Sequence, residues 1–225
     1  MALHLPTLKT RSLTALIFLA VMLLGLLWDQ WSFIILFAII HFGCWYEFVR
    51  LMKKIYSTNY GRRCLWGLLY ITLPVLLMIH LRIVDAGQWL DLGFIIPCVL
   101  VFSIWINDTM AYVVGSFIGR TSFSKISPKK TWEGTIGGAL LAVATITLTG
   151  YFAFGMSNYV ALIIISLIAA IAGTAGDLLE SKLKRMAGVK DSGTIMPGHG
   201  GFLDRFDSLL VAIPFVWIYV NLIMR

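Results

Sequence analysis

A series of long apolar runs, separated by short charged loops, most strongly limits what this chain can fold into. The expected helices cover residues 13–28, 31–49, 66–83, 92–117, 134–154, 159–183 and 203–224. A helix needs about 20 apolar residues to cross the hydrocarbon core of a bilayer. Backbone groups in hydrocarbon must also be satisfied inside their own segment, which favours helices. The sequence therefore predicts an all-α, polytopic membrane helical bundle with about seven transmembrane helices.

The amount and position of charge support a membrane protein. Only 13% of the residues are charged, against roughly 25% in soluble domains. The net charge of +7 would suit nucleic acid, but the cations lie in short loops between apolar runs, as membrane topology requires. We expect the lipid bilayer as a partner and no nucleic acid. Cys44, Cys64 and Cys98 lack metal or redox spacing, so we interpret them as apolar fillers.

The first apolar run, residues 13–28, has two interpretations: a signal peptide or an uncleaved helix. We favour the helix, because no small-residue cleavage site follows and a second apolar run starts at Trp31. The run is short for a full span, so we expect it to tilt against the second helix or to form a partly interfacial hairpin with it. In the third helix, Pro74 is expected to cause a kink.

The positions of the cations predict an orientation. With the N-terminus in the cytoplasm and alternating spans, all of the 18 Lys and Arg residues except Arg82 and Arg225 face the cytoplasm. We predict an N-in topology and one integral membrane domain, residues 1–225. Internal repeats and linkers are not evident in the sequence.

The densest charge lies in residues 176–208, between the last two helices. Helical spacing of i, i+3, i+4 and i+7 puts one set of polar residues on a single face: Asp177, Glu180, Ser181 and Lys184. The last helix repeats the i, i+3, i+4 part of this spacing with Asp204, Asp207 and Ser208. Small residues at 172–176 allow another backbone to come close. The spacing predicts two acidic helix faces at the cytoplasmic boundary.

These acids allow two interpretations, because a carboxylate at membrane depth normally pairs with a cation or binds a metal. Asp177 can pair with Lys184 or Arg205 to hold helices together. Alternatively, the acids hold a metal, and oxygen ligands favour Mg²⁺ over Zn²⁺. Metal and clustered cations together suit polyphosphate. The nearby cations are Lys182, Lys184, Arg185, Lys190 and Arg205, and each alone is also compatible with an ordinary positive-inside flank.

Three further segments are candidates for phosphate or ligand contacts. Gly198, Gly200 and Gly201 allow backbone amides to approach a phosphate, and His199 between them is either structural or a ligand contact. The block from Ser127 to Gly134 places paired lysines and hydroxyls at a helix start, although a basic loop is expected there anyway. Asp108 is either a third part of the site or a helix-end acid that touches water.

Several of these motifs resemble one family. The pattern of Ser181-x-Leu183-Lys184-Arg185, Lys190-Asp191, Pro197-x-His199-Gly200-Gly201 and Asp204-Arg205-Phe206-Asp207 resembles the signature of the phosphatidate cytidylyltransferases, the CDP-diacylglycerol synthases. The Ser127–Gly134 block and Asn107-Asp108-x-x-Ala111-Tyr112 are similar to that family too. The resemblance covers residues 106–208.

The resemblance implies an enzyme of the cytoplasmic (inner) membrane that joins CTP and phosphatidate into CDP-diacylglycerol and pyrophosphate. It implies Mg²⁺ as cofactor with an accompanying K⁺, a homodimer, and an active site that faces the cytoplasm. Catalytic roles fall on Asp177, Asp204, Lys190 and Arg205. The metal ligands are Asp177 and Asp204, with Asp191, Asp207 and Asp108 as second choices. Contacts to the substrate phosphates fall on Ser127, Lys129, Lys130, Thr131, Glu133, Ser181, Lys184, Arg185 and His199.

Two other functions fit part of the pattern. A CTP-dependent polyprenol or lipid kinase would share the metal and nucleotide needs but release CDP. An ion-coupled transporter would use intramembrane acids without turnover of CTP.

Overall fold

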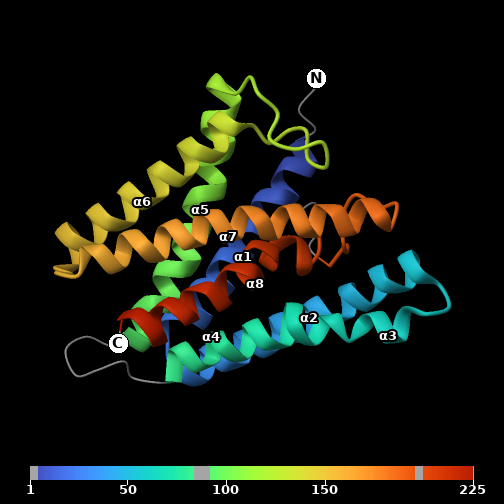
Figure 1. The fold of residues 1–225 in the computed structure, drawn as a ribbon, viewed down its shortest axis with the longest axis horizontal. Helices are drawn as coiled ribbons and strands as arrows, with labels where there is room; N and C mark the ends of the chain where they lie inside the picture. The colour runs from blue at the N-terminus through green and yellow to red at the C-terminus, as the bar shows by residue number, and fades with distance from the viewer. Residues whose placement is uncertain (1–4, 84–91, 196–199, 225) are drawn as a thin grey trace. The chain divides into compact units, whose positions relative to one another are not determined.

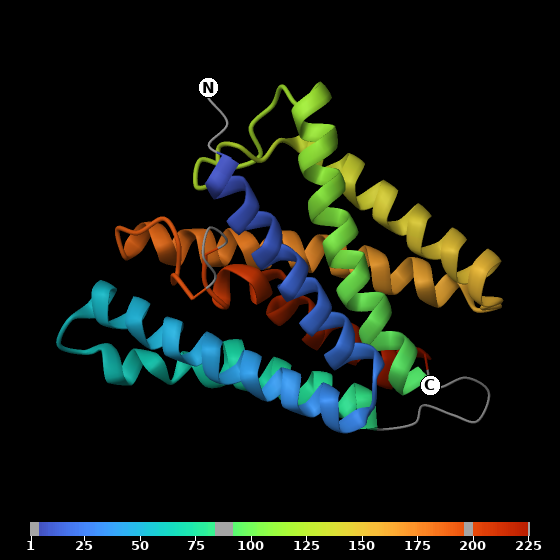
Figure 2. The same cartoon turned by 180° about the vertical axis from the view of Figure 1, so that it is seen from behind.

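The computed structural model describes residues 5–83, 92–195 and 200–224, and side chains within them from Ser12 onward. Every named element in these ranges is a helix (Figures 1 and 2). The chain divides into two compact units. Unit 1 comprises Met1–Ile79 and Leu183–Phe206, and unit 2 comprises His80–Lys182 and Asp207–Arg225. The expectation of one domain stays a prediction.

The helices follow the predicted apolar runs closely. They are α1 (Leu5–Leu27), α2 (Gln30–Tyr56), α3 (Tyr60–Cys64), η1 (Leu68–Thr72), α4 (Leu73–Ile83), α5 (Leu92–Ile118), α6 (Trp132–Phe154), α7 (Tyr159–Met186), α8 (Leu203–Tyr219) and η2 (Val220–Met224). Among the described residues, six helical segments are long and apolar enough to cross a membrane, and Ser12–Leu27 is a shorter apolar helix. The predicted all-α membrane bundle is confirmed. The count of seven and the N-in orientation stay predictions.

In unit 1, a short turn connects α1 to α2. Asp29 caps α2, because its carboxylate accepts a hydrogen bond from the Ser32 amide at 2.7 Å while the Ser32 hydroxyl accepts from the Asp29 amide at 3.1 Å. This reciprocal capping box satisfies two donors that a helix start leaves open. Gly25 lies directly against Leu36, so a larger residue at position 25 would separate α1 from α2. The turn thus fixes α2, which carries a site residue described below.

The third apolar run contains a π turn close to Pro74. The π-helical turn η1 ends just before Pro74, and the Leu73 amide donates to the carbonyl of Leu68, five residues earlier. Proline has no amide hydrogen, and its ring pushes against the carbonyl of the preceding turn. Such widened turns are one way in which a helix absorbs this conflict. The structure therefore has a π turn next to Pro74, and the expected kink stays a prediction.

In unit 2, small residues let helices pack closely, as membrane helices require. A Cβ atom on Gly134 of α6 would lie 2.6 Å from the Ala111 carbonyl oxygen of α5. On α7, a Cβ atom on Gly176 would lie 2.5 Å from the Asp207 carbonyl oxygen. The predicted close approach at residues 172–176 is confirmed. The buried Ser103 hydroxyl of α5 donates a hydrogen bond to the buried Ser166 hydroxyl of α7 at 3.1 Å, which links these two helices.

Candidate functional site

The loop at residues 119–131, which leads into α6, is built by residues that we had predicted to bind substrate. The Thr131 hydroxyl accepts from the Gly134 amide at 3.1 Å and caps α6. The Glu133 carboxylate accepts from the amides of Arg120 and Thr121 at 3.2 Å. In the structure, Thr131 and Glu133 thus hold the loop together. Their predicted contact with substrate stays a prediction.

Lys130 connects this loop to α7. Its amide donates to the Ser127 carbonyl at 3.0 Å, and its carbonyl accepts from the Phe123 amide at 2.7 Å. With the backbone held on both sides, its ammonium lies 2.5 Å from the Asp177 carboxylate. Asp108 of α5 is near enough to interact electrostatically with both Lys130 and Asp177. We call Asp108, Lys130 and Asp177 the Asp177 cluster.

The Asp177 cluster contains two carboxylate side chains and one lysine, and the ion pair joins Lys130 to Asp177. Asp108 also accepts from the side-chain amide of Asn107 at 3.3 Å. We had left open whether Asp177 pairs with Lys184 or Arg205. The structure instead pairs it with Lys130, a residue that we had predicted to bind phosphate. A predicted metal ligand and a predicted phosphate ligand therefore contact each other directly.

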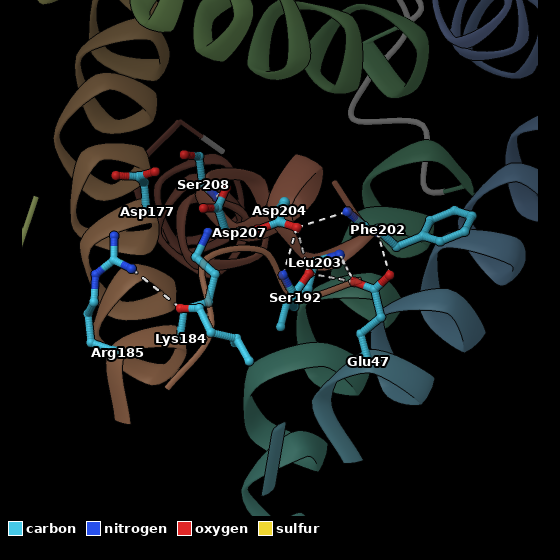
Figure 3. Close-up of polar contacts among 12 residues, drawn as sticks. Glu47, Asp177, Lys184, Arg185, Ser192, Phe202, Leu203, Asp204, Asp207 and Ser208 are labelled. Carbon is cyan, nitrogen blue, oxygen red and sulfur yellow. Dashed lines mark hydrogen bonds and ion pairs between the residues drawn. The ribbon is translucent and has the colours of Figure 1, made fainter. Parts of the chain in front are cut away.

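A second cluster lies in unit 1 at the start of α8 (Figure 3). One oxygen of the Asp204 carboxylate lies 2.6 Å from the Lys184 ammonium. Its other oxygen accepts from the Gly201 amide at 2.8 Å and from the Ser192 amide and hydroxyl, both at 2.9 Å. The predicted site residues Lys184 and Asp204 are thus brought together. Ser192, which we had not singled out, supplies two of the donors.

Glu47 of α2 completes the second cluster. Its side chain is 0% exposed. It accepts from the Ser192 hydroxyl at 2.7 Å, from the Phe202 amide at 3.0 Å and from the Leu203 amide at 2.8 Å (Figure 3). We call Glu47, Lys184, Ser192 and Asp204 the Glu47–Asp204 cluster. In this cluster Lys184 pairs with Asp204, and the Ser192 hydroxyl links Asp204 to Glu47.

In the glycine segment before α8, the Gly201 amide donates to the Asp204 carboxylate. The expected approach of these amides to a phosphate stays a prediction. Gly200 has a φ of +83°, in the left-handed region that favours glycine, and this conformation leads the chain into α8. Gly198 and His199 lie outside the described residues, so the predicted ligand contact of His199 stays a prediction.

The remaining predicted residues are spread over both units. In unit 1, Lys190, Asp191 and Arg205 are exposed, and the Arg185 guanidinium donates to the Val189 carbonyl at 3.3 Å. In unit 2, Lys129 is exposed and Ser181 is partly buried on α7. Asp207 is buried, and its carboxylate accepts from the Ser208 amide at 2.6 Å.

The chemistry of the acids fits a hard cation. Among the described residues, no three His, Cys, Asp or Glu side chains form a metal-binding group. Mg²⁺ does not need such a cage, since it is usually held by one or two carboxylates, with substrate phosphates and water as further ligands. Asp177 is paired with Lys130, and Asp108 adds a second carboxylate to the cluster. The Asp177 cluster therefore offers the oxygen ligands that Mg²⁺ prefers.

Comparison with known proteins agrees with the resemblance read from the motifs. Residues 56–223 match the cytidylyltransferase family. A phosphatidate cytidylyltransferase of Rickettsia felis is 34% identical over 213 residues, which covers 91% of this chain and 88% of the relative. The chain belongs to the cytidylyltransferase family. A relative of the same name in Rickettsia conorii is 33% identical over 89% of this chain and 86% of its own length. A Bacillus subtilis relative is 46% identical over 120 residues, 53% of this chain and 45% of the relative.

The residues that match the cytidylyltransferase family contain every member of the two clusters except Glu47. Asp108, Lys130, Asp177, Lys184, Ser192 and Asp204 lie within the matched residues. Glu47 precedes them, and our reading of the sequence missed it. A signal was present nevertheless, because an ionisable residue inside an apolar helix is by default a candidate for function. Asp177 lies in unit 2 and Asp204 in unit 1.

Proposed function

We propose that this protein transfers the cytidylyl group of CTP to phosphatidate, giving CDP-diacylglycerol and pyrophosphate for phospholipid biosynthesis. The observation that carries the proposal is the 34% identity to a phosphatidate cytidylyltransferase over 91% of the chain. Two clusters of carboxylate and lysine, on helices apolar enough to cross a membrane, suit a polyphosphate and a lipid phosphate as substrates.

The reaction needs little help from a base. A phosphatidate phosphate oxygen is already anionic at neutral pH, and it attacks the α-phosphorus of CTP. A new oxygen–phosphorus bond forms while the bond between the α-phosphorus and the bridging oxygen to the β-phosphate breaks. The electron pair leaves with pyrophosphate. The difficulty is to bring anions together and to stabilise the charge that develops, which positioned cations do.

We assign Asp177 and Asp204, each within its own cluster, as ligands for Mg²⁺, with Asp108, Asp191 and Asp207 as second choices and K⁺ as an accompanying ion. Bound Mg²⁺ would neutralise nucleotide phosphate charge and orient the phosphates. The carboxylates of Asp177 and Asp204 supply the oxygen ligands that this ion prefers.

Lys130 and Lys184 have a double role in this proposal. Each is paired with one of the two assigned metal ligands. Phosphate oxygens compete for the same ammonium groups, since charge-assisted hydrogen bonds to phosphate are strong. The lysines would hold the carboxylates in place and then contact phosphates. Lys129, Lys190 and Arg205, all exposed, would add to the attraction for either substrate.

We further propose that the protein resides in the inner membrane with an N-in orientation, works as a homodimer, and opens its site to the cytoplasm. Phosphatidate would then enter from the cytoplasmic leaflet with its tails left in the bilayer. Lys125 is exposed in the loop before α6. In a background without the native cysteines, Lys125→Cys should react with an impermeant maleimide in inverted inner-membrane vesicles but not in intact spheroplasts. Labelling in spheroplasts alone would reverse this orientation.

The activity is tested with purified protein, labelled CTP, phosphatidate and Mg²⁺. We expect a CDP-lipid and pyrophosphate, loss of both with a chelator, and recovery on addition of Mg²⁺. Release of CDP with a phosphorylated alcohol would support a lipid kinase instead. Substrate flux into sealed vesicles without turnover of CTP would support a transporter.

A further inference from the structure

The carboxylate of Glu47 is the most completely enclosed acidic group of the Glu47–Asp204 cluster. Its side chain is 0% exposed and accepts three hydrogen bonds from the segment around the start of α8. Its partners lie 145 to 156 residues further along the chain. A buried acid costs stability unless it is hydrogen-bonded or paired. The three donors around this carboxylate satisfy the hydrogen bonds that a buried acid needs.

Two glycines leave room for the Glu47 carboxylate. A Cβ atom added to Gly193 would overlap Glu47 Oε1, and one added to Gly201 would overlap both carboxylate oxygens. Neither glycine has a left-handed φ, so the backbone at both positions accepts any residue. The need for glycine at 193 and 201 therefore comes from the space that Glu47 occupies.

The hydroxyl of Ser192 links Glu47 to Asp204. Its oxygen lies 2.7 Å from Glu47 Oε2 and 2.9 Å from Asp204 Oδ2. A serine hydroxyl has one proton to donate, so the two carboxylates compete for it. In addition, Phe202 and Leu203, which Glu47 holds, immediately precede Asp204 in the chain. A change at Glu47 is thus transmitted to Asp204 by a side chain and by the backbone.

We infer that Glu47 is a positioning residue: it clamps Ser192 and the first amides of α8, and so fixes the orientation of the Asp204 carboxylate. The consequence for turnover rests on the proposed function, in which Asp204 is a ligand of Mg²⁺. The clamp itself rests on the contacts alone. Glu47 lies outside residues 56–223, which match the cytidylyltransferase family, and its role is argued from its own contacts.

The first test is Glu47→Gln, which keeps the size but turns an NH₂ group toward amide donors that need an acceptor. The rate with saturating CTP should fall by about 10- to 100-fold, as for other residues that orient metal ligands. The Mg²⁺ concentration for half-maximal rate should rise, which general destabilisation would not cause. The matched control is Asp29→Ala, which removes the cap at the other end of α2 and should leave the Mg²⁺ dependence unchanged.

The second test uses the glycines. Gly193→Ala alone should strongly reduce thermal stability or folded yield, because the added methyl group overlaps the Glu47 carboxylate. Glu47→Ala removes that carboxylate. In this background, Gly193→Ala should reduce thermal stability or folded yield less than it does in the wild type. Additive effects of the two substitutions would contradict the proposed clamp, because separate sites usually add.

The third test does not depend on activity. Hydrogen–deuterium exchange of purified wild type and Glu47→Gln is compared for peptides that cover residues 190–206. Faster exchange of this segment in the variant, with α6 peptides unchanged as a reference, is the expected result. Equal exchange rates would overturn the clamp. If exchange changes but the wild type forms no CDP-lipid, the proposed function fails and the clamp stands.

Discussion

Lys130 Nζ lies 2.5 Å from Asp177 Oδ2, so the loop before α6 and the helix α7 are joined by one ion pair. Lys184 and Asp204 form a similar pair at 2.6 Å in the other unit. In both pairs, a lysine expected to bind phosphate neutralises an acid expected to bind Mg²⁺. Each pair thus places a lysine ammonium directly against a carboxylate within its own unit.

Asp177→Asn should lower turnover by about 100-fold or more, the cost of removing a group that stabilises transition-state charge. The substitution keeps the size of the side chain, and about 30% of the Lys130 and Asp177 side chains remains exposed, so the fold should tolerate it. Initial rates and the melting temperature are measured together. Asp29→Asn, in the exposed turn before α2, serves as control. Near-normal turnover in Asp177→Asn would refute the metal assignment.

Lys130→Met should raise the KM for CTP by about 10-fold, since a hydrogen bond to a charged group contributes about 1.5–3 kcal/mol. Its neighbour Lys129 has the same charge but is exposed, so Lys129→Met is the matched control. It should change the KM much less at physiological salt, because exposed charges are screened. Steady-state kinetics at two salt concentrations measures both. Equal increases of the KM for CTP in the two variants would show that the ion pair with Asp177 gives Lys130 no special role in binding CTP.

Gly176→Ala should destabilise unit 2 by about 1–3 kcal/mol, the usual cost of overpacking. The added methyl group would lie 2.5 Å from the Asp207 carbonyl oxygen and 3.0 Å from the Ser208 Cα atom. Gly61→Ala is the control, because nothing lies within 4 Å of the added atom. It should stabilise by about 0.5–1 kcal/mol, since glycine costs conformational entropy in a helix. Thermal unfolding in detergent compares them, and equal melting temperatures would contradict the close packing.

Thr131→Val should cost about 0.5–2 kcal/mol of stability, because it removes the hydroxyl that caps α6. Thr131→Ser keeps the hydroxyl and should behave like the wild type in both stability and rate. Melting temperature and the KM for CTP are measured for both variants. If Thr131→Val raises the KM but leaves the melting temperature unchanged, the hydroxyl contacts substrate rather than capping the helix.

The sequence was sufficient to predict most of the helical architecture, because membrane helices follow directly from apolar length. Pro74 lies next to a π turn, where it removes a backbone donor, but Pro97 and Pro214 lie inside the α-helices α5 and α8. The small residues around Gly176 indicated close packing for an equally local reason. The length of an apolar run does not specify which side chains contact each other. The pairing of Asp177 with Lys130 was therefore not predicted.

The candidate site was predictable where its residues form a motif in the sequence. Asp177, Lys184 and Asp204 lie in one charged stretch, and a charged stretch in an apolar chain is easily noticed. Glu47 is a single acid in α2, and its partners lie 145 or more residues away. Its importance depends on a tertiary contact that has no local pattern. Thr131 and Glu133 show the converse, because residues within a recognised motif also build the loop that carries it.

The clamp around Glu47 also has a consequence for how the chain is made. During synthesis, α2 emerges and meets the translocation machinery well before Ser192, Phe202 and Leu203 exist. An isolated carboxylate is costly in hydrocarbon, so until then we expect Glu47 to stay in contact with water. The first helices therefore reach their final environment only when the last quarter of the chain arrives. Nascent chains that stop before α8 should be recognised as incomplete by membrane quality control.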